Sequence, residues 1–402
     1  MKSRSIVQEY PKVWISLIVT VLVTTVLMMA SQITGGPTIS YGYHGAGSAP
    51  QITASASERI AGKSDAKYSV DFTPDVTAPA QEITIQFPDG FTVASNPTVT
   101  SGRIGNGQAG SIQVQGGINY TPTISVTGQV VTLALPAPLD LTIAEGVQFQ
   151  FTTGITNPTA IGLTGTFAVD SDASGQVSDN SLGVTIVHDA ASQLGFGTEP
   201  VGGNRQTGQS TIGTQPVVQI LDQFGNLVTT DPSGGSTESV TIAFQSGTNT
   251  EGSALSGTTS VNVSWPAGTA TFTDLATDTV GTYNFTATDT NFSPNLTDVN
   301  SAAFSTNAAT WYALASTGSD SNACLSTGVG NACLTIGGAM GKATIKGDTI
   351  SAAAGTYAET VNITKPLTVQ GAGITSIIQP SSGNAVEIRV SNITVDNLKI
   401  VG

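Results

Sequence analysis

The chain has 402 residues, which is enough for two to four domains. Only 10% of the residues are charged, and Val, Ile and Phe recur among many Gly, Ser and Thr, so the composition favours β-sandwiches and solenoids over helical or disordered chains. The net charge of −14 argues against nucleic acid as a partner and against docking on an anionic lipid surface.

The N-terminus carries an apolar segment, since Val13–Ala30 is free of charge and follows a basic flank. This order is typical of an export signal, and 18 residues is just long enough for a helix to span a bilayer. We expect residues 1–36 to be either a signal peptide or a signal anchor, which would be held in the membrane by residues 13–30. A buried core helix is the third alternative. Residues 37–52 are rich in Gly, Ser and Pro and are predicted to be a flexible tether.

Residues 53–187 alternate apolar and polar side chains in runs bounded by turn signals such as Pro88-Asp89-Gly90. This period of two indicates strands with one buried face, which predicts a β-sandwich. The alternating apolar positions are Tyr68, Val70, Phe72, Ile83, Ile85, Phe87, Val131, Leu133, Leu135, Val147, Phe149, Phe151, Phe167 and Val169. The phrases ITIQFPDGFTV and GVQFQFTTGITNPT resemble stalk-like sandwich domains of prokaryotic surface proteins.

Residues 188–306 repeat the β pattern with more specific phrases. The segment Asp222–Asn226 (DQFGN) is predicted to turn one strand back into the next, because Gly and Asn tolerate positive φ. Phe272 and Leu275 are expected to be buried, and Tyr283 to fix a sheet corner. With QPVVQILDQFGNLVT and GTATFTDLATDTVGTYNFTATD, this region resembles the bacterial immunoglobulin-like domains of invasin- and intimin-type adhesins. The resemblance implies that residues 188–306 are a spacer domain. It implies no catalytic residue.

Residues 310–402 combine one helical pattern with very short β-rich runs. Between Leu334 and Ile345, one helical face is formed by Ile336, Ala339, Met340 and Ala343. The runs that follow are Val361–Ile363, Leu367–Val369, Ile377–Ile378, Val386–Ile388, Ile393–Val395 and Leu398–Ile400. This part resembles the start of a right-handed parallel β-helix of the pectin-lyase-like superfamily, which implies an incomplete solenoid with the short helix as its lid. The superfamily's catalytic acids and calcium-binding Asp residues lie on later turns and have no counterpart in residues 310–402.

Cys324 and Cys333 are the only cysteines and lie in a Gly-, Ser- and Asn-rich loop of an exported segment. Two nearby cysteines in an exported chain favour a disulfide. Neither His44 nor His188, the only histidines, is close in sequence, so metal binding by the cysteines is not expected. We predict a structural disulfide that ties down the loop before the helix.

Two further groups of polar residues have features of functional sites. The segment from Asp170 to Gly175 has the opening spacing of a calcium loop, but position twelve is Ser181 instead of Glu, so a polar β-turn is favoured. His44 and His188 lie in linking segments and are expected to be solvated.

The acids of the last region are Asp348, Glu359 and Glu387. Two of these acids could catalyse glycoside cleavage only if their carboxyl groups came within roughly 5–10 Å of each other. Glu359 is expected at a surface turn. The sequence therefore predicts no catalytic, cofactor-binding or metal-binding residues.

These features together predict an all-β chain: an N-terminal transmembrane or signal helix, two immunoglobulin-like β-sandwiches, then the first rungs of a parallel β-helix. The expected protein is extracellular or on the cell surface, a stalk that presents the β-helix for adhesion, envelope structure or glycan binding. Its expected partners are extracellular polysaccharide or envelope components. The alternatives are a surface-displayed polysaccharide lyase or carbohydrate esterase with catalytic rungs beyond residue 402, and a phage-derived or secretion-system component.

Overall fold

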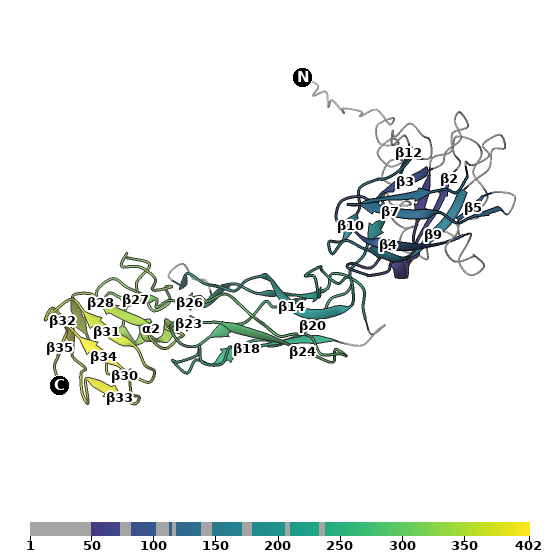
Figure 1. Cartoon of the computed structure of the whole chain (residues 1–402). Helices are drawn as coiled ribbons and strands as arrows, with labels where there is room; N and C mark the ends of the chain where they lie inside the picture. Colours follow the sequence, from purple (N-terminus) through teal and green to yellow (C-terminus); the bar gives the residue numbers. More distant parts are fainter. Residues whose placement is uncertain are drawn as a thin grey trace, which may run out of the picture. The chain divides into compact units, whose positions relative to one another are not determined.

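The computed structural model describes residues 50–72, 82–101, 112–114, 118–137, 147–170, 179–205, 210–232 and 238–402. The chain divides into two compact units, Met1–Asp189 and Ala190–Gly402 (Figure 1). Strands dominate the described ranges, with one short α-helix, which confirms the all-β class. The predicted signal or anchor, residues 1–36, lies outside these ranges. Among the described helices, none has the length and apolar character needed to cross a bilayer.

The first unit contains two main antiparallel sheets. One has the order β1-β2-β9-β5-β6, with β4 also paired to β9, and the other has the order β12-β11-β3-β8-β7. The strands of the first are β1 (Gln51–Thr53), β2 (Tyr68–Phe72), β4 (Thr92–Ser101), β5 (Ile112–Val114), β6 (Ile118–Tyr120) and β9 (Val147–Thr156). Those of the second are β3 (Glu82–Gln86), β7 (Thr123–Thr127), β8 (Val130–Ala134), β11 (Phe167–Asp170) and β12 (Asp179–Ser181). A further pair joins β10 (Gly162–Leu163) to β13 (Thr185–Ile186).

Both sheets of the first unit contribute to one hydrophobic core. All fourteen alternating apolar positions predicted from the sequence belong to it, each at most 8% exposed. The predicted last residue of the tether, residue 52, is wrong, because Gln51–Thr53 form β1 and pair with β2. Ile52 is 4% exposed, so burial of this side chain draws the segment into the sheet.

The second unit begins with an antiparallel half, residues 190–306. Its larger sheets have the orders β14-β17-β21 and β20-β18-β24-β25. Their strands are β14 (Ala191–Thr198), β17 (Val217–Asp222), β18 (Ser239–Phe244), β20 (Ser260–Asn262), β21 (Thr269–Thr271), β24 (Phe285–Thr290) and β25 (Val299–Asn300). Three smaller pairs are β15 (Val201–Gly202) with β16 (Ile212–Thr214), β19 (Leu255–Ser256) with β22 (Ala276–Thr277), and β23 (Gly281–Tyr283) with β26 (Phe304–Thr306).

The side chains singled out in the antiparallel half have the predicted roles. Phe272 and Leu275 are each 1% exposed within its core. The Tyr283 hydroxyl donates a 2.9 Å hydrogen bond to the Thr279 carbonyl, which fixes the corner before β23. In the turn after β17, Gly225 has a φ of +84°, a value that favours glycine.

The second unit continues with a parallel half, residues 310–402, in which strands stack in three parallel sheets. The first sheet contains β27 (Thr310–Ala313), β28 (Thr349–Ala352), β31 (Thr368–Gly371) and β34 (Thr394–Asp396). The second contains β29 (Gly355–Tyr357), β32 (Ser376–Ile378) and β35 (Lys399–Ile400), and the third β30 (Val361–Ile363) and β33 (Val386–Ile388). The chain visits the three sheets in turn, so each pass adds one strand to each stack.

The predicted helix is present but shorter, as α2 (Ile336–Lys342). Its predicted apolar face is buried, with Ile336 and Ala339 unexposed and Met340 at 9%. Thr335 caps its start by accepting a hydrogen bond from Gly338 N, and Ala343 leaves the helix in an extended conformation. The helix packs on β27, β28 and β30, so it covers the core at the start of the parallel half.

Candidate functional site

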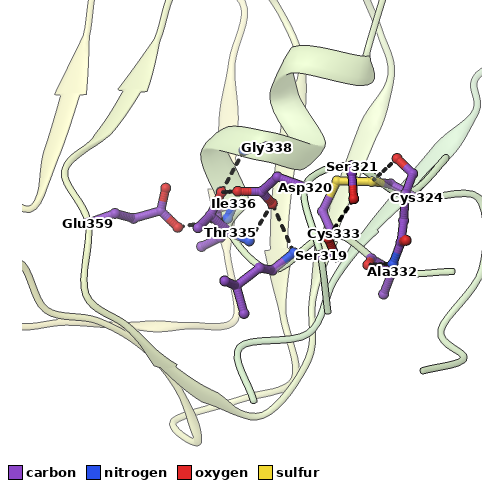
Figure 2. Close-up of a disulfide and its surroundings, with 12 residues drawn as sticks. Ser319, Asp320, Ser321, Cys324, Ala332, Cys333, Thr335, Ile336, Gly338 and Glu359 are labelled. Carbon is purple, nitrogen blue, oxygen red and sulfur yellow. Dashed lines mark hydrogen bonds between the residues drawn. A yellow bond between two sulfur atoms is a disulfide. The ribbon is translucent and has the colours of Figure 1, made fainter. Parts of the chain in front are cut away.

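The two cysteines are joined in a disulfide, with their Cα atoms 5.0 Å apart (Figure 2). Both are fully buried. Backbone hydrogen bonds attach the two arms of the loop to β27: Tyr312 N donates to Cys324 O (2.7 Å), and Cys333 N donates to Tyr312 O (2.8 Å). The disulfide thus closes the base of the loop that connects β27 to α2, in agreement with the prediction.

Two carboxylates lie beside the start of α2 (Figure 2). Glu359 accepts hydrogen bonds from Ile336 N (2.7 Å) and Gly337 N (2.9 Å), and Asp320 accepts from Leu334 N and Thr335 N (2.9 Å each). The bonds from Thr335 N, Ile336 N and Gly337 N satisfy backbone N–H groups that the start of a helix leaves without intrahelical partners.

Glu359 therefore has a different environment from the exposed surface turn expected from the sequence. It is half-buried. Burial raises the pKa of its carboxyl, the two N–H donors oppose that rise, and the nearby charge of Asp320 adds to it. Glu359 follows Tyr357 by two residues, and the reach of its side chain back to α2 could not be seen in the local pattern.

Asp348 is the centre of a buried joint between the antiparallel and parallel halves. Its carboxylate is fully buried and forms a bidentate pair with Arg205, whose Nη2 donates to Oδ2 at 2.9 Å and whose Nη1 donates to Oδ1. Ala309 N donates to Oδ1 and Trp311 Nε1 donates to Oδ2, both at 3.0 Å. The Arg205 guanidinium also donates to Thr344 Oγ1 (2.8 Å) and lies 5.9 Å from the Trp311 ring centroid. Buried charges of this kind are stable only when paired and hydrogen-bonded, and here both conditions are met.

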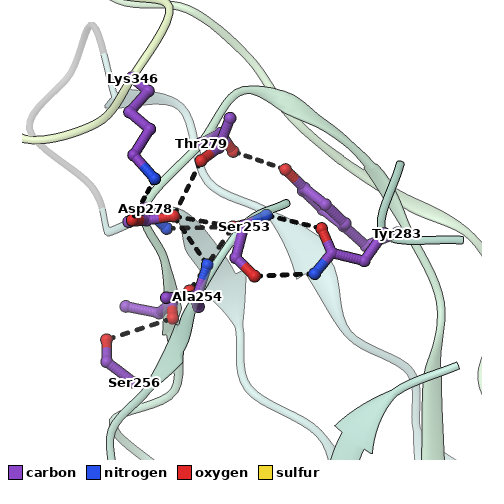
Figure 3. Close-up of polar contacts among 9 residues, drawn as sticks. Ser253, Ala254, Ser256, Asp278, Thr279, Tyr283 and Lys346 are labelled. Carbon is purple, nitrogen blue, oxygen red and sulfur yellow. Dashed lines mark hydrogen bonds and ion pairs between the residues drawn. The ribbon is translucent and has the colours of Figure 1, made fainter. Parts of the chain in front are cut away.

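A second, partly exposed contact lies between the same halves (Figure 3). Lys346 Nζ is 3.0 Å from Asp278 Oδ2. The backbones of the two segments are also joined, because Lys346 N donates to Asp278 O (2.7 Å) and Val280 N donates to Lys346 O (3.0 Å). Burial alone would raise the pKa of Asp278, but hydrogen bonds from Ala254 N and Lys346 Nζ outweigh it and lower the pKa to about 2.

The other candidate residues that the structure describes have their own local partners. Glu387 is 2.9 Å from Arg389 on the surface, and this hydrogen bond lowers the pKa of the Glu387 carboxyl. His188 is half-buried, and its Nδ1 lies 2.8 Å from the Asp189 carbonyl. His44 and residues 171–178 of the candidate calcium loop fall outside the described ranges. In the part of the chain that the structure describes, no three His, Cys, Asp or Glu residues are grouped to hold a metal ion.

Sequence reasoning missed Arg205, Asp278 and Lys346 and left Asp348 without a partner. Arg205 and Asp348 are 143 residues apart, so no local pattern links them. The arrangement offers mechanical coupling: a buried bidentate pair, a backbone bridge and an ion pair fasten the first parallel strands to the antiparallel sheets.

No protein-family model matches the chain, and no curated protein matches it in sequence. Among solved structures, the bacterial hydrophobin BslA is 17% identical over 35% of this chain and 98% of its own, with a TM-score of 0.23. The Actinomyces fimbrial adhesin FimA is 11% identical over 63% of this chain and 96% of its own, with a TM-score of 0.24. These TM-scores are too low for either likeness to indicate a shared fold.

Proposed function

We propose that the chain is an exported surface protein in which two immunoglobulin-like β-sandwiches carry the first turns of a right-handed parallel β-helix. Antiparallel sheets around one core in residues 53–187, and again in residues 188–306, support the two sandwiches. Three stacks of parallel strands that begin beneath a short helix support the β-helix. The role of this stalk is adhesion, envelope structure or glycan binding.

The observation that carries the proposal is the buried pair between Arg205 and Asp348. Neighbouring domains move relative to each other unless their interface is extensive or specifically fixed. A stalk that presents a binding surface needs a rigid attachment to the part that carries that surface. The unexposed Asp348 carboxylate, with hydrogen bonds from both halves, provides one.

The disulfide supports an extracellular or cell-surface location. Structural disulfides persist in oxidising compartments and are rare in the cytosol. Together with the apolar segment at residues 13–30, the Cys324–Cys333 pair favours export of the second unit. Asp348 is held in the buried pair and Glu359 accepts hydrogen bonds from the N–H groups of α2, so both acids serve the structure of the stalk.

Surface display can be tested on cells that produce the whole chain with an epitope tag after Gly402. The tag should bind antibody on intact cells, and protease added outside should remove it. Mass spectrometry of unreduced material should show Cys324 and Cys333 paired. A tag that is accessible only after lysis, together with free thiols, would overturn the proposal.

A further inference from the structure

The sequence carries the motif Asn-x-Ser/Thr, with x other than Pro, at seven positions. This is the acceptor motif for N-linked glycosylation of exported proteins. So short a motif also arises by chance in a chain rich in Thr and Ser, so the structure must separate usable acceptors from the rest. A usable acceptor needs an exposed Asn with a free amide, and an exposed hydroxyl two residues later. The seven are Asn119, Asn262, Asn284, Asn291, Asn295, Asn362 and Asn392.

The clearest acceptor is Asn362, on β30 of the third parallel sheet. Ile363 is unexposed in the core, whereas Asn362 before it and Thr364 after it are exposed. Because side chains alternate along extended backbone, the Asn362 amide and the Thr364 hydroxyl lie on the same outward side. Within the described part of the chain, the Asn362 side chain makes no hydrogen bond, so its nitrogen is available for attachment of a sugar.

The motifs of Asn262, Asn295 and Asn392 share this arrangement. In each, the Asn and the hydroxyl-bearing residue are exposed, and the middle residue packs in or against a hydrophobic core. The side chains of these three Asn residues likewise form no hydrogen bond with any residue that the structure describes. The middle residues are Val263, Leu296 and Ile393.

The remaining three motifs differ from these four. The half-buried Asn284 amide donates a 2.9 Å hydrogen bond to the Ser301 carbonyl, and a glycan on its nitrogen would disrupt this contact. The Asn291 motif is followed directly by Pro294, which restricts the backbone of the Ser before it. The side chain of Asn119 lies outside the part of the chain that the structure describes.

We propose that Asn262, Asn295, Asn362 and Asn392 are acceptors of N-linked glycans. The co-reactant is an oligosaccharide joined through phosphate to a membrane lipid. The Asn Nδ2 atom forms a bond to C1 of the first sugar, and the bond from C1 to the phosphate oxygen breaks. The lipid phosphate leaves with that electron pair, and the amide releases one proton. This inference rests on the proposed export of the chain, because the motif is an acceptor in exported proteins.

The four acceptors all lie in the second unit, two in the antiparallel half and two in the parallel half. Only 10% of the residues of the chain are charged, so its surface has few strongly hydrated groups. An N-linked glycan is bulky and solubilising. Glycans at these positions would hydrate the surface and leave both cores intact, because the acceptor side chains point away from them.

The test is glycopeptide mass spectrometry on the whole chain, purified from the surface of the cells that naturally produce it. We expect peptides that contain Asn362 to carry a glycan and those with Asn284 or Asn384 to carry none. Asn384 is exposed but has no hydroxyl residue at the second position after it. Thr364→Ala should abolish the glycan on Asn362. The matched control, Thr364→Ser, keeps the motif at the same exposed position and should retain the glycan.

Three results would overturn the inference: an unmodified Asn362 on a chain whose tag is accessible on intact cells, a glycan on Asn362 that persists in Thr364→Ala, or a glycan on Asn284. The first would remove the modification and leave the surface role standing. An inaccessible tag would instead remove the surface role. The same peptide map tests each of the other three acceptors, and an unmodified peptide removes that acceptor.

Discussion

The antiparallel and parallel halves of the second unit bury their cores in different ways. In the antiparallel half, sheets cover each other, and Phe272 and Tyr283 are at most 1% exposed. In the parallel half, each turn covers the one before it. Ile378 is 1% exposed, whereas Ile400, its partner on the next turn, is 52% exposed; Ile363 and Ile388 differ in the same way, at 0% and 57%.

This difference shows where each half needs support. A stack of turns is stabilised by contacts with neighbouring turns, so its first turn needs a partner of another kind. Here α2, the disulfide loop and the joint around Asp348 supply that partner. The antiparallel half has no such dependence, because its two larger sheets cover a shared core.

The largest expected effect is that of Asp348→Ala. The substitution leaves the buried Arg205 guanidinium without its carboxylate and removes acceptors for Ala309 N and Trp311 Nε1. Loss of one partner of a buried pair costs about 3–5 kcal/mol of unfolding free energy. Denaturant unfolding followed by tryptophan fluorescence would measure it.

The matched control for Asp348→Ala is Arg389→Ala, which breaks the exposed pair with Glu387. Exposed ion pairs contribute little, so no measurable change is expected. Equal effects of the two substitutions would show that the buried joint does not hold the halves together.

The next largest effect is expected for the double substitution Cys324→Ser and Cys333→Ser. The lost crosslink closes a short loop, and the chain-entropy relation gives about 2–3 kcal/mol for such a loop. Calorimetry should show a lower melting temperature for the variant, and the unaltered chain under reducing conditions should behave like the variant. Identical melting of the oxidised chain and the variant would contradict a stabilising role.

A smaller effect is expected for Tyr283→Phe. The substitution keeps the buried ring and deletes the hydroxyl that donates to the Thr279 carbonyl. One such bond contributes about 1 kcal/mol. If chemical denaturation shows no loss of stability, the hydroxyl does not fix this sheet corner.

The smallest effect concerns pH and the contact between Asp278 and Lys346. The pKa of Asp278 is lowered to about 2, below its usual value. The stability that the ionised carboxylate contributes is therefore present above about pH 4 and is lost as the pH falls toward 2. Melting curves across this range should show a shallower pH dependence for Asp278→Asn than for the unaltered chain. Two parallel pH profiles would argue against the contact.

Local patterns predicted much of the fold. Alternation identified the core of the first unit, from Tyr68 on β2 to Val169 on β11, because a period of two determines which strand face is buried. Helical spacing identified the buried face of α2 through Ile336 and Ala339. These signals depend only on neighbouring residues.

The joint depends on contacts between residues that are far apart in the sequence, and no local pattern predicts these contacts. Arg205 meets Asp348 across 143 positions, and Lys346 meets Asp278 through a bridge between two loops. The resemblance to a β-helix places a surface turn at Glu359, yet the side chain of this residue reaches α2. Charged residues are scarce in this chain. Which of them form buried pairs can be recognised only once the topology is known.

Hydrogen exchange measured by mass spectrometry on the whole chain, across a denaturant series, tests the fixed joint most directly. A fixed joint predicts that β18 of the antiparallel half and β28 of the parallel half lose protection at the same denaturant concentration. It also predicts that Asp348→Ala makes β28 exchange first while β18 stays protected. Loss of protection in β28 well before β18 in the unaltered chain would contradict a joint that fastens the two halves.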